Sequence, residues 1–469
     1  MKRTTLFFIF LLLNQYSFAQ TNQKLRVLVL TDIEADPDDA QSMVRFLTYS
    51  NQWDVEGLIA TTSIHQKDWA AVETIHDIVD AYAKIQPNLL KHEKGYPTAA
   101  FLKTKIKKGL EKYGMDGVGE GKDSEGSDWI IKVLEKQDSR PLWVCIWGGS
   151  NCLAQALWKI NKTKSAVEVE KLYKKLRVYT ISDQDDSNPW IRKTFPSIFF
   201  ITSPGFTYMS ATWRGINAKQ EGFTNDVISD AWLSENIQQK HSILGTKYPD
   251  VAYGMEGDTP TFMGLINNGL NIPEIPDYGG WGGRYELKIP EFVEPKPNAY
   301  VKVPQKEEPE TRPIWTNAKD SVVSTIDRKS YIGNLETILR WREDFQNDFA
   351  ARMDWTFKDF KDANHPPIPK LNHAENVTIK SGEKFFLDAK GTTDPDNDAL
   401  SYYWLQYREA GTYAGNISFR PYASNMYRVP FTAPEVTKPE TIHFILKVTD
   451  KGKPALTRYK RVIATIIPK

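Results

Sequence analysis

Five carboxylates are crowded into the eight residues that begin at Asp32 and end at Asp39, with the sequence DIEADPDD. They are Asp32, Glu34, Asp36, Asp38 and Asp39. Like charges at this density repel one another strongly unless a cation lies among them. Because Ca²⁺ and Mg²⁺ prefer carboxylate oxygens, the cluster predicts a divalent-metal site. The alternative is an acidic helix start that only complements the helix dipole, for which two acids would suffice.

A strand and a helix are expected on either side of this cluster. The branched apolar run Val27–Leu30 predicts a buried strand. The segment Asp36–Tyr49 predicts a helix with Asp36 as its N-cap and Pro37 at its first position. Its apolar face would comprise Met43, Phe46 and Leu47. The acids would therefore lie where the strand ends and the helix begins.

Strand and helix patterns alternate over the first two hundred residues. The predicted strands are Arg26–Leu30, Val55–Thr61, Pro141–Trp147, Leu176–Ile181 and Ser197–Thr202. The main predicted helices between them are Asp36–Tyr49, Trp69–Ile85 and Trp129–Lys136. This alternation indicates an α/β fold with a mainly parallel sheet flanked by helices. Ligands bind such sheets at the carboxyl ends of the strands, where the acidic cluster is expected.

Other polar and aromatic side chains follow the later strands or lie in glycine-rich loops. Individually these are ordinary turn residues, and their convergence at one edge of the sheet makes them informative. The substrate-binding candidates are His65, Asn151, Asp183, Asn188, Trp190, Glu256 and Trp281. His65 could donate a proton to a leaving group or could be a loop histidine bonded to backbone. Trp190 and Trp281 could stack on a sugar or brace their loops.

The first twenty residues have the pattern of a secretory signal peptide. Lys2 and Arg3 precede an apolar core at 6–13 and a small-residue region at 17–20. The apolar core is too short to span a bilayer. We therefore expect residues 1–20 to be a cleaved signal peptide and the mature protein to be periplasmic or secreted.

The overall charge excludes several classes of partner. Lysine and arginine number 60 and aspartate and glutamate 59, so no net field favours nucleic acid or an acidic membrane surface. No segment after the signal peptide approaches transmembrane length, so no membrane insertion is expected. With two cysteines in the chain, the fold is not expected to depend on disulfides. A homo-oligomer is compatible with this composition.

The pattern changes in the last hundred residues. A helical stretch, Tyr331–Asp362, is predicted to close an α/β domain over residues 21–363, and the proline-rich segment 364–369 resembles a stiff linker. Apolar residues then alternate with polar ones, which predicts a small immunoglobulin-like β-sandwich over residues 364–469. Within it, Asp394–Asp398 could bind Ca²⁺ or form a rigid turn.

The acidic motif resembles that of a known family. Asp32, Glu34, Asp38 and Asp39 have the spacing of the N-terminal signature of inosine-uridine-preferring nucleoside hydrolases. The whole arrangement, with EGDTP at 256–260, YGGWGGRY at 278–285 and the appended sandwich, is similar to a secreted bacterial subgroup. That subgroup is nucleoside-hydrolase-like, and some members are labelled cellulose-binding.

The resemblance implies roles for five residues and Ca²⁺ as the cofactor. Asp39 would chelate the ion, Ser150 would offer its carbonyl and Asp258 its carboxylate. Glu34 would be both a ligand and the group that orients or deprotonates the attacking water, and Asp38 would bind a sugar hydroxyl. Glu34 and Asp38 are thus the catalytic candidates, and the metal candidates are Glu34, Asp39, Ser150 and Asp258.

The sequence departs from the nucleoside hydrolases in ways that bear on the substrate. Glu34 stands where they have aspartate, and Ala35-Asp36 replaces their Pro-Gly. We therefore expect a secreted calcium-dependent hydrolase that cleaves a glycosidic or N-glycosidic bond of a carbohydrate or glycoside. One alternative is a non-catalytic protein that binds a cellulose-like polysaccharide. A nucleoside N-ribohydrolase is a further alternative.

Overall fold

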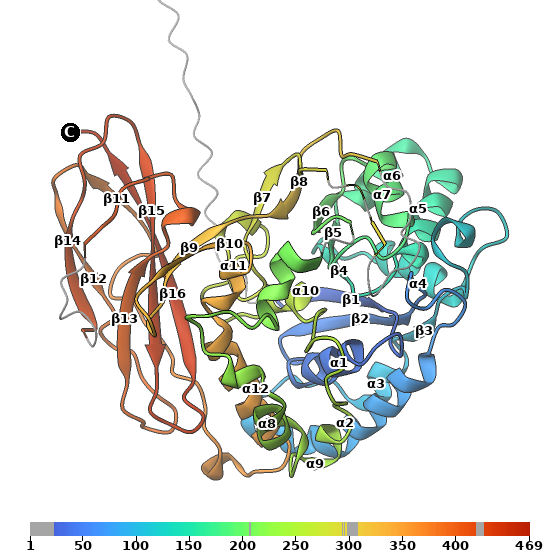
Figure 1. Ribbon diagram of the computed structural model, residues 1–469, viewed down its shortest axis with the longest axis horizontal. Helices are drawn as coiled ribbons and strands as arrows, with labels where there is room; N and C mark the ends of the chain where they lie inside the picture. Colours follow the sequence, from blue (N-terminus) through green and yellow to red (C-terminus); the bar gives the residue numbers. More distant parts are fainter. Residues whose placement is uncertain (1–22, 206–207, 293, 295, 298–307, 419–425) are drawn as a thin grey trace, which may run out of the picture.

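An eight-stranded sheet forms the centre of the larger domain (Figure 1). The computed structural model describes residues 23–205, 208–292, 294, 296–297, 308–418 and 426–469, so the predicted signal peptide lies outside the described residues. The strands run in the order β3-β2-β1-β4-β5-β6-β8-β7. Their bounds are β1 Leu25–Thr31, β2 Trp53–Ala60, β3 Ile106–Lys108, β4 Leu142–Ile146, β5 Leu176–Thr180, β6 Phe199–Thr202, β7 Tyr285–Lys288 and β8 Ile314–Asn317. All neighbours pair in parallel except β7 and β8.

Helices cover both faces of this sheet. The helices are α1 Asp38–Thr48, α2 Val72–His92, α3 Ala99–Lys103, α4 Glu125–Leu134, α5 Asn151–Thr163, α6 Ala166–Tyr173, α7 Ser187–Thr194, α8 Asp230–Leu233, α9 Ser242–Gly245, α10 Pro260–Met263, α11 Glu336–Leu339 and α12 Arg342–Asp354. Alternate residues of β1 supply the two cores: Val27 and Val29 pack on the side of α1 and α2, and Leu28 and Leu30 on the side of α4 and α5. This is why β1 is apolar on both faces.

The strand order reverses next to β1. The chain proceeds from β1 to β2 and β3 on one side and then returns to place β4 on the other side. Such a switch point leaves a crevice beyond the carboxyl ends of the two central strands. Asp32 follows β1 directly, and the turn at Gly148–Ser150 lies after β4, so both border this crevice.

The second domain is a β-sandwich. One sheet has the order β11-β16-β15-β13, and β12 pairs with β14 in the other. The bounds are β11 Asn376–Lys380, β12 Lys384–Asp388, β13 Ser401–Gln406, β14 Arg428–Thr432, β15 Glu440–Thr449 and β16 Thr457–Ile467. Phe431 of β14 and Phe444 of β15 meet between the sheets, with ring centroids 4.7 Å apart. The predicted combination of a mainly parallel α/β domain and a sandwich is confirmed.

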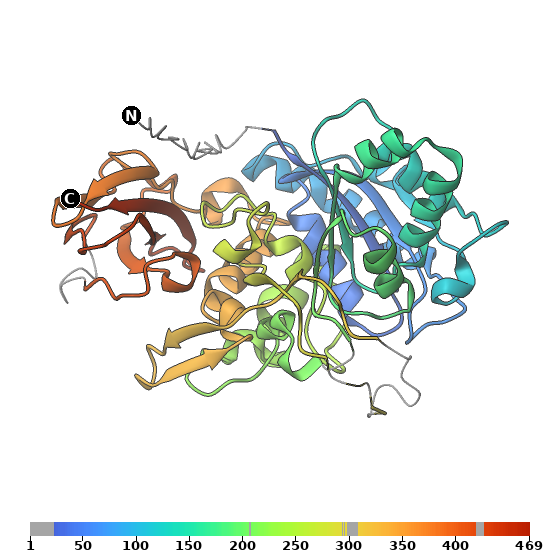
Figure 2. The same cartoon turned by 90° about the horizontal axis from the view of Figure 1, so that it is seen from above.

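Helix α12 connects the two domains. It lies between the main sheet and the sandwich in both views (Figures 1 and 2). Lys447 of β15 pairs with Asp344 of α12 at 2.7 Å, and Arg458 of β16 pairs with Asp348. The sandwich therefore docks on a helix of the larger domain through buried and half-buried ion pairs.

Two predictions of local structure were wrong. The stretch Tyr331–Asp362 is not one helix, because its first residues belong to β10 Ser330–Gly333, which pairs with β9 Asp320–Val323 as an antiparallel hairpin. Two separate helices, α11 and α12, follow. At the start of α1, Pro37 and not Asp36 occupies the N-cap position. Asp36 still serves the helix start, since its carboxylate accepts the N–H of Asp38 at 3.1 Å.

No helix in the described part of the chain combines the length and the apolar character needed to cross a membrane.

Candidate metal centre and surrounding site

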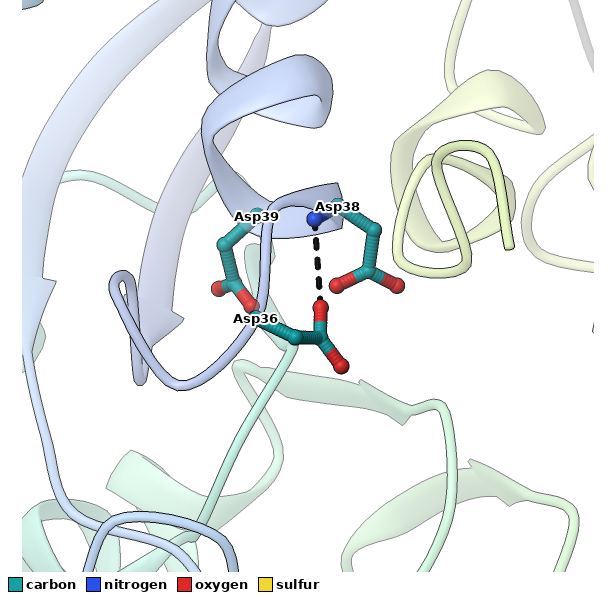
Figure 3. A group of neighbouring side chains, drawn as sticks. All are labelled: Asp36, Asp38 and Asp39. Carbon is teal, nitrogen blue, oxygen red and sulfur yellow. Dashed lines mark hydrogen bonds between the residues drawn. The ribbon is translucent and has the colours of Figure 1, made fainter. Parts of the chain in front are cut away.

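Three carboxylates gather at the start of α1 (Figure 3). Asp36, Asp38 and Asp39 each place a carboxylate oxygen within 4.8 Å of the others. Asp39 is buried and also accepts a hydrogen bond from the Thr31 hydroxyl, whereas Asp36 and Asp38 are half-buried. The turn between β1 and α1 thus aims three acids at one point.

Asp258 joins this group from a distant loop that precedes α10. It is 3% exposed, and its Oδ2 is buried with no hydrogen-bond partner among the described residues. The loop is held against α1 because the Gly257 N–H donates to Asp38 Oδ2 at 3.1 Å. A β-carbon at position 257 would lie 2.6 Å from that oxygen, so the close approach requires glycine. An unpartnered carboxylate oxygen in this place has the chemistry of a cation ligand.

Asp32 forms the floor of the site at the carboxyl end of β1. It is 3% exposed. Gly148, beyond the end of β4, lies so close that a β-carbon there would be 2.3 Å from Asp32 Oδ1. The glycine turn after β4 therefore makes room for this carboxylate.

The four deepest acids repel one another. The pKa values of Asp38, Asp39 and Asp258 are raised well above their usual range, and that of Asp32 is raised as well. Burial is the largest cause in each case, and neighbouring carboxylates raise the values further. A divalent cation bound among these oxygens would remove both penalties. The donor set, composed of oxygens alone, fits Ca²⁺.

Glu34 lies apart from the cluster. It is exposed, and Thr74 of α2 donates its hydroxyl to Glu34 Oε1 at 2.7 Å. Its backbone has φ of 83°, a left-handed conformation that few non-glycine residues adopt. This turn directs the side chain toward α2 and leaves Asp32 and Asp36 beside Asp38 and Asp39. The implied roles of Glu34 as ligand and base stay predictions.

Ser150 and Asn151 lie at the start of α5. The Ser150 carbonyl accepts the N–H of Ala154 at 2.9 Å, and its own N–H donates to Asp185 Oδ2 at 2.8 Å. Burial raises the pKa of Asp185 to about 6. The Asn151 amide donates to the Lys112 carbonyl at 2.7 Å and to Thr62 Oγ1 at 3.2 Å. Asn151 thereby ties a loop to α5, and the metal-ligand role of the Ser150 carbonyl stays a prediction.

Three other substrate-binding candidates are held in buried polar networks. Asp183 makes a two-point pair with Arg192, at 2.7 and 2.9 Å. Glu256 pairs with Arg45 and accepts the hydroxyl of Tyr248 at 2.8 Å. The third, Asn188, is also buried, and its amide donates to the Ser182 carbonyl at 3.2 Å. These partners position the loops that surround the acids.

The two candidate tryptophans differ in position. Trp190 is partly exposed and packs edge-on against Phe195, with centroids 5.3 Å apart. Trp281 is fully buried, and its Nε1–H donates to the hydroxyl of Tyr459 in the sandwich at 3.1 Å. The contacts of Trp281 are those of a residue that braces the domain interface.

His65 lies at the rim of the acidic site together with two aromatic residues that the sequence did not single out. His65 is exposed, its Nε2 is 3.4 Å from the Tyr208 hydroxyl, and its charge lowers the pKa of Asp32. Tyr208 packs edge-on against Trp213 with centroids 5.6 Å apart. Trp213 also lies against Gly257, where a β-carbon would be 3.2 Å from its ring. Tyr208 is half-buried and Trp213 is 7% exposed, and we call this pair beside the carboxylates the aromatic wall.

A family model described as cellulose-binding Sde182, nucleoside hydrolase-like domain, matches residues 26–285, which is more than half of the chain. The chain belongs to this family. A second model, described as the C-terminal domain of cellulose-binding protein Sde0182, matches residues 384–466. The resemblance noted in the sequence is therefore confirmed for both parts of the chain.

A solved structure agrees with this assignment. A nucleoside hydrolase-related hypothetical protein from Saccharophagus degradans, described as associated with carbohydrate metabolism, is 34% identical. The match covers 94% of this chain and 100% of that chain, with a TM-score of 0.77. A PKD domain is 17% identical over 22% of this chain and 86% of its own, with a TM-score of 0.16. No curated protein matches the chain.

Proposed function

We propose that this member of the Sde182 family is a secreted or periplasmic calcium-dependent hydrolase that cleaves a glycosidic or N-glycosidic bond of a carbohydrate or glycoside. The observation that carries the proposal is the set of four buried or half-buried acids, Asp32, Asp38, Asp39 and Asp258, with raised pKa values. Burying such a set of charged carboxylates destabilises the folded chain. The set is explained if some of the acids bind a cation and another accepts a proton during catalysis.

The residues divide into two groups by depth. Asp32, Asp39 and Asp258 are almost fully buried, and each influences at least one of the others electrostatically. We assign them to hold the ion. Calcium bound there would supply a centre that holds a water and sugar hydroxyls together.

Asp38 is the best-placed proton acceptor. It is half-buried, whereas Asp32, Asp39 and Asp258 are almost fully buried, and a carboxylate beside a metal-held water can accept a proton from it. Asp36 beside it is available to accept a sugar hydroxyl. Glu34 is assigned no role in catalysis, because its carboxylate accepts a hydrogen bond from Thr74 outside the cluster.

The aromatic wall would bind the sugar. The apolar face of a pyranose or furanose ring packs on an aromatic ring, and half-buried Tyr208, which rests on the buried Trp213, is the ring that a sugar would meet. Positive charge develops on the sugar ring as the leaving group departs, and the carboxylates nearby would stabilise it. His65, at the rim, is the side chain available to the leaving group.

The alternative proposal is a carbohydrate-binding protein without turnover. The observation that favours it is the exposed position of Glu34, since the resemblance gave that residue the role of base. The family description, which refers to cellulose binding, also supports it. A nucleoside N-ribohydrolase is the further alternative, which the substrate panel below includes.

The test is release of reducing sugar or free base from a panel of glycosides, polysaccharides and nucleosides by the chain from residue 21 onward. Each reaction is run with Ca²⁺ and with a calcium chelator. We expect the chelator to abolish release and Asp38→Asn to lower its rate about 10²-fold. The control Asp80→Asn, which alters an exposed ion pair with Lys103, should retain the activity. Calcium-dependent retention on cellulose without release would contradict the hydrolase and support the binding protein.

A further inference from the structure

A second group of acids lies in the sandwich, in the turn before β13. Asp394, Asp396 and Asp398 place carboxylate oxygens within 4.8 Å of one another. Asp394 Oδ1 accepts the N–H groups of Asp396 and Asp398, at 2.9 and 3.0 Å, which by itself describes a rigid turn. Asp394 Oδ2, however, is buried with no hydrogen-bond partner among the described residues. The turn alone does not account for that oxygen.

Asp450, at the end of β15, supplies an independent observation. It is 0% exposed. Its Oδ1 accepts the N–H groups of Leu456 and Gly452, at 2.9 and 3.1 Å, whereas its Oδ2 is buried with no partner in the described part of the chain. Burial raises the pKa of Asp450, and the charge of nearby Asp394 raises it further.

Asn364, in the linker between the domains, contributes a third such oxygen. It is 6% exposed. Its amide nitrogen donates to Asp450 Oδ1 at 3.1 Å and to the Pro454 carbonyl at 2.7 Å. These two acceptors fix the orientation of the amide, because the reversed orientation would set oxygen against oxygen. Asn364 Oδ1 is then left buried with no donor among the described residues.

Three buried acceptors without donors are more than one water molecule could satisfy, since it has two hydrogens to donate. A hard cation satisfies all of them and also offsets the repulsion between Asp394 and Asp450. Ca²⁺ takes about six to eight oxygen ligands in flexible geometry, and short acidic turns supply them. The half-buried carboxylate of Asp398 is available to complete the shell, and that of Asp396, which is held by the N–H and the Nδ1 of His365, lies beside it.

We propose that Asn364, Asp394 and Asp450 bind a Ca²⁺ ion at the junction of the two domains, with Asp396 and Asp398 as further ligands. We call this the junction site. It is separate from the acids at the end of β1 and does not depend on the proposed hydrolase activity.

The ion would fasten the linker at both ends. On one side, Trp355, the residue after α12, donates its Nε1–H to the Asn364 carbonyl at 2.9 Å. On the other side, the His365 N–H donates to Asp396 Oδ2 at 2.7 Å. An ion held by Asn364 and by the sandwich acids would therefore stabilise the position of the sandwich relative to α12.

The test is Ca²⁺ titration by calorimetry of the chain from residue 21 onward, comparing the parent with Asp394→Asn and Asp450→Asn. Each variant is expected to bind one Ca²⁺ fewer per chain, or to bind it at least about tenfold more weakly, because a charged ligand is lost. Asp362→Asn, an exposed acid near the linker, is the matched control and should bind like the parent. Asp39→Asn should retain the junction site whatever its effect at β1.

Each result decides the proposal. If Asp394→Asn and Asp450→Asn bind as many ions as the parent with the same affinity, the junction site is overturned. Asp450 is buried, so Asp450→Asn could prevent folding. In that case Asp394→Asn, which alters a turn near the surface, tests the proposal alone. A parent that binds one ion, lost in Asp394→Asn and kept in Asp39→Asn, would support the junction site and contradict the proposed metal centre at β1.

Discussion

The acids at the end of β1 and those of the junction site have similar ligands in different surroundings. In the first region, Asp39 lies at the start of α1 and Asp258 lies in the distant loop before α10. The aromatic wall lies beside them. In the second, Asp394 belongs to one turn, and the added ligands come from the end of β15 and the linker. A binding surface beside an ion suits chemistry on a ligand, whereas ligands from the linker and the sandwich suit a structural ion.

The comparison also shows why counting carboxylates is not enough. Glu34 belongs to the acidic motif by spacing but lies outside the cluster in space, bonded to Thr74. Asn364 and Asp450 have no acidic motif around them in sequence, yet each directs an unpartnered oxygen into the junction.

The largest effect should come from removing a proposed ion-holding acid at β1. Asp258→Asn is expected to lower kcat/KM by about 10³-fold, because it weakens the ion that stabilises several kcal/mol of charge. The measurement is steady-state hydrolysis of the best substrate from the panel over a range of Ca²⁺ concentrations. Asp394→Asn, which alters the junction site, is the matched comparison and should leave kcat/KM nearly unchanged. Equal losses of kcat/KM in Asp258→Asn and Asp394→Asn would contradict the assignment of a catalytic ion to β1 and a structural ion to the junction site.

The next effect distinguishes Asp38 from Glu34. Asp38→Asn should lower kcat by about 10²-fold if it is the proton acceptor. Glu34→Gln should change kcat within about twofold, as is usual for an exposed side chain. Single-turnover rates with saturating Ca²⁺ measure both. A large loss in Glu34→Gln with full activity in Asp38→Asn would reverse the two assignments and restore the role that the resemblance implied.

A smaller effect is expected at the aromatic wall. Trp213→Ala should raise KM about five- to tenfold with little change in kcat, because the buried Trp213 ring holds Tyr208 in place to stack on the sugar. Trp213→Phe, which retains an aromatic ring, should recover most of the affinity. If KM is unchanged in Trp213→Ala, the wall does not contact the substrate.

The smallest effect concerns the stability of the junction. Ca²⁺ should raise the melting temperature of the parent by a few degrees through the junction site, since a ligand that binds the folded state stabilises it. Thermal unfolding of Asp39→Asn, with and without Ca²⁺, isolates this contribution. The shift should disappear when Asp394→Asn is added to that variant. A shift that persists in the double variant would assign the stabilisation to other sites.

The sequence predicted the fold where local patterns agree with tertiary packing. The apolar run before Asp32 forms β1, and the periodicity after it forms α1. The long helix over Tyr331–Asp362 failed because its first residues pair in a hairpin, which amphipathic spacing does not reveal. Pairing with the preceding strand overrides local helical preference there.

The candidate site was predictable in part. The motif located Asp38 and Asp39, and the resemblance supplied Asp258, which no local pattern connects to them. The left-handed backbone at Glu34 could not be foreseen from residue spacing. Trp213 was missed because its role depends on the tertiary approach of the Gly257 loop.

The measurement that tests the account most directly is an anomalous difference map from crystals of this protein grown with Tb³⁺ in place of Ca²⁺. The account predicts one peak among Asp32, Asp39 and Asp258, and a second among Asn364, Asp394 and Asp450. It also predicts that Glu34 remains outside the first peak's ligand shell. A map without a peak at the end of β1 would contradict the proposed metal centre and the calcium-dependent hydrolase built on it.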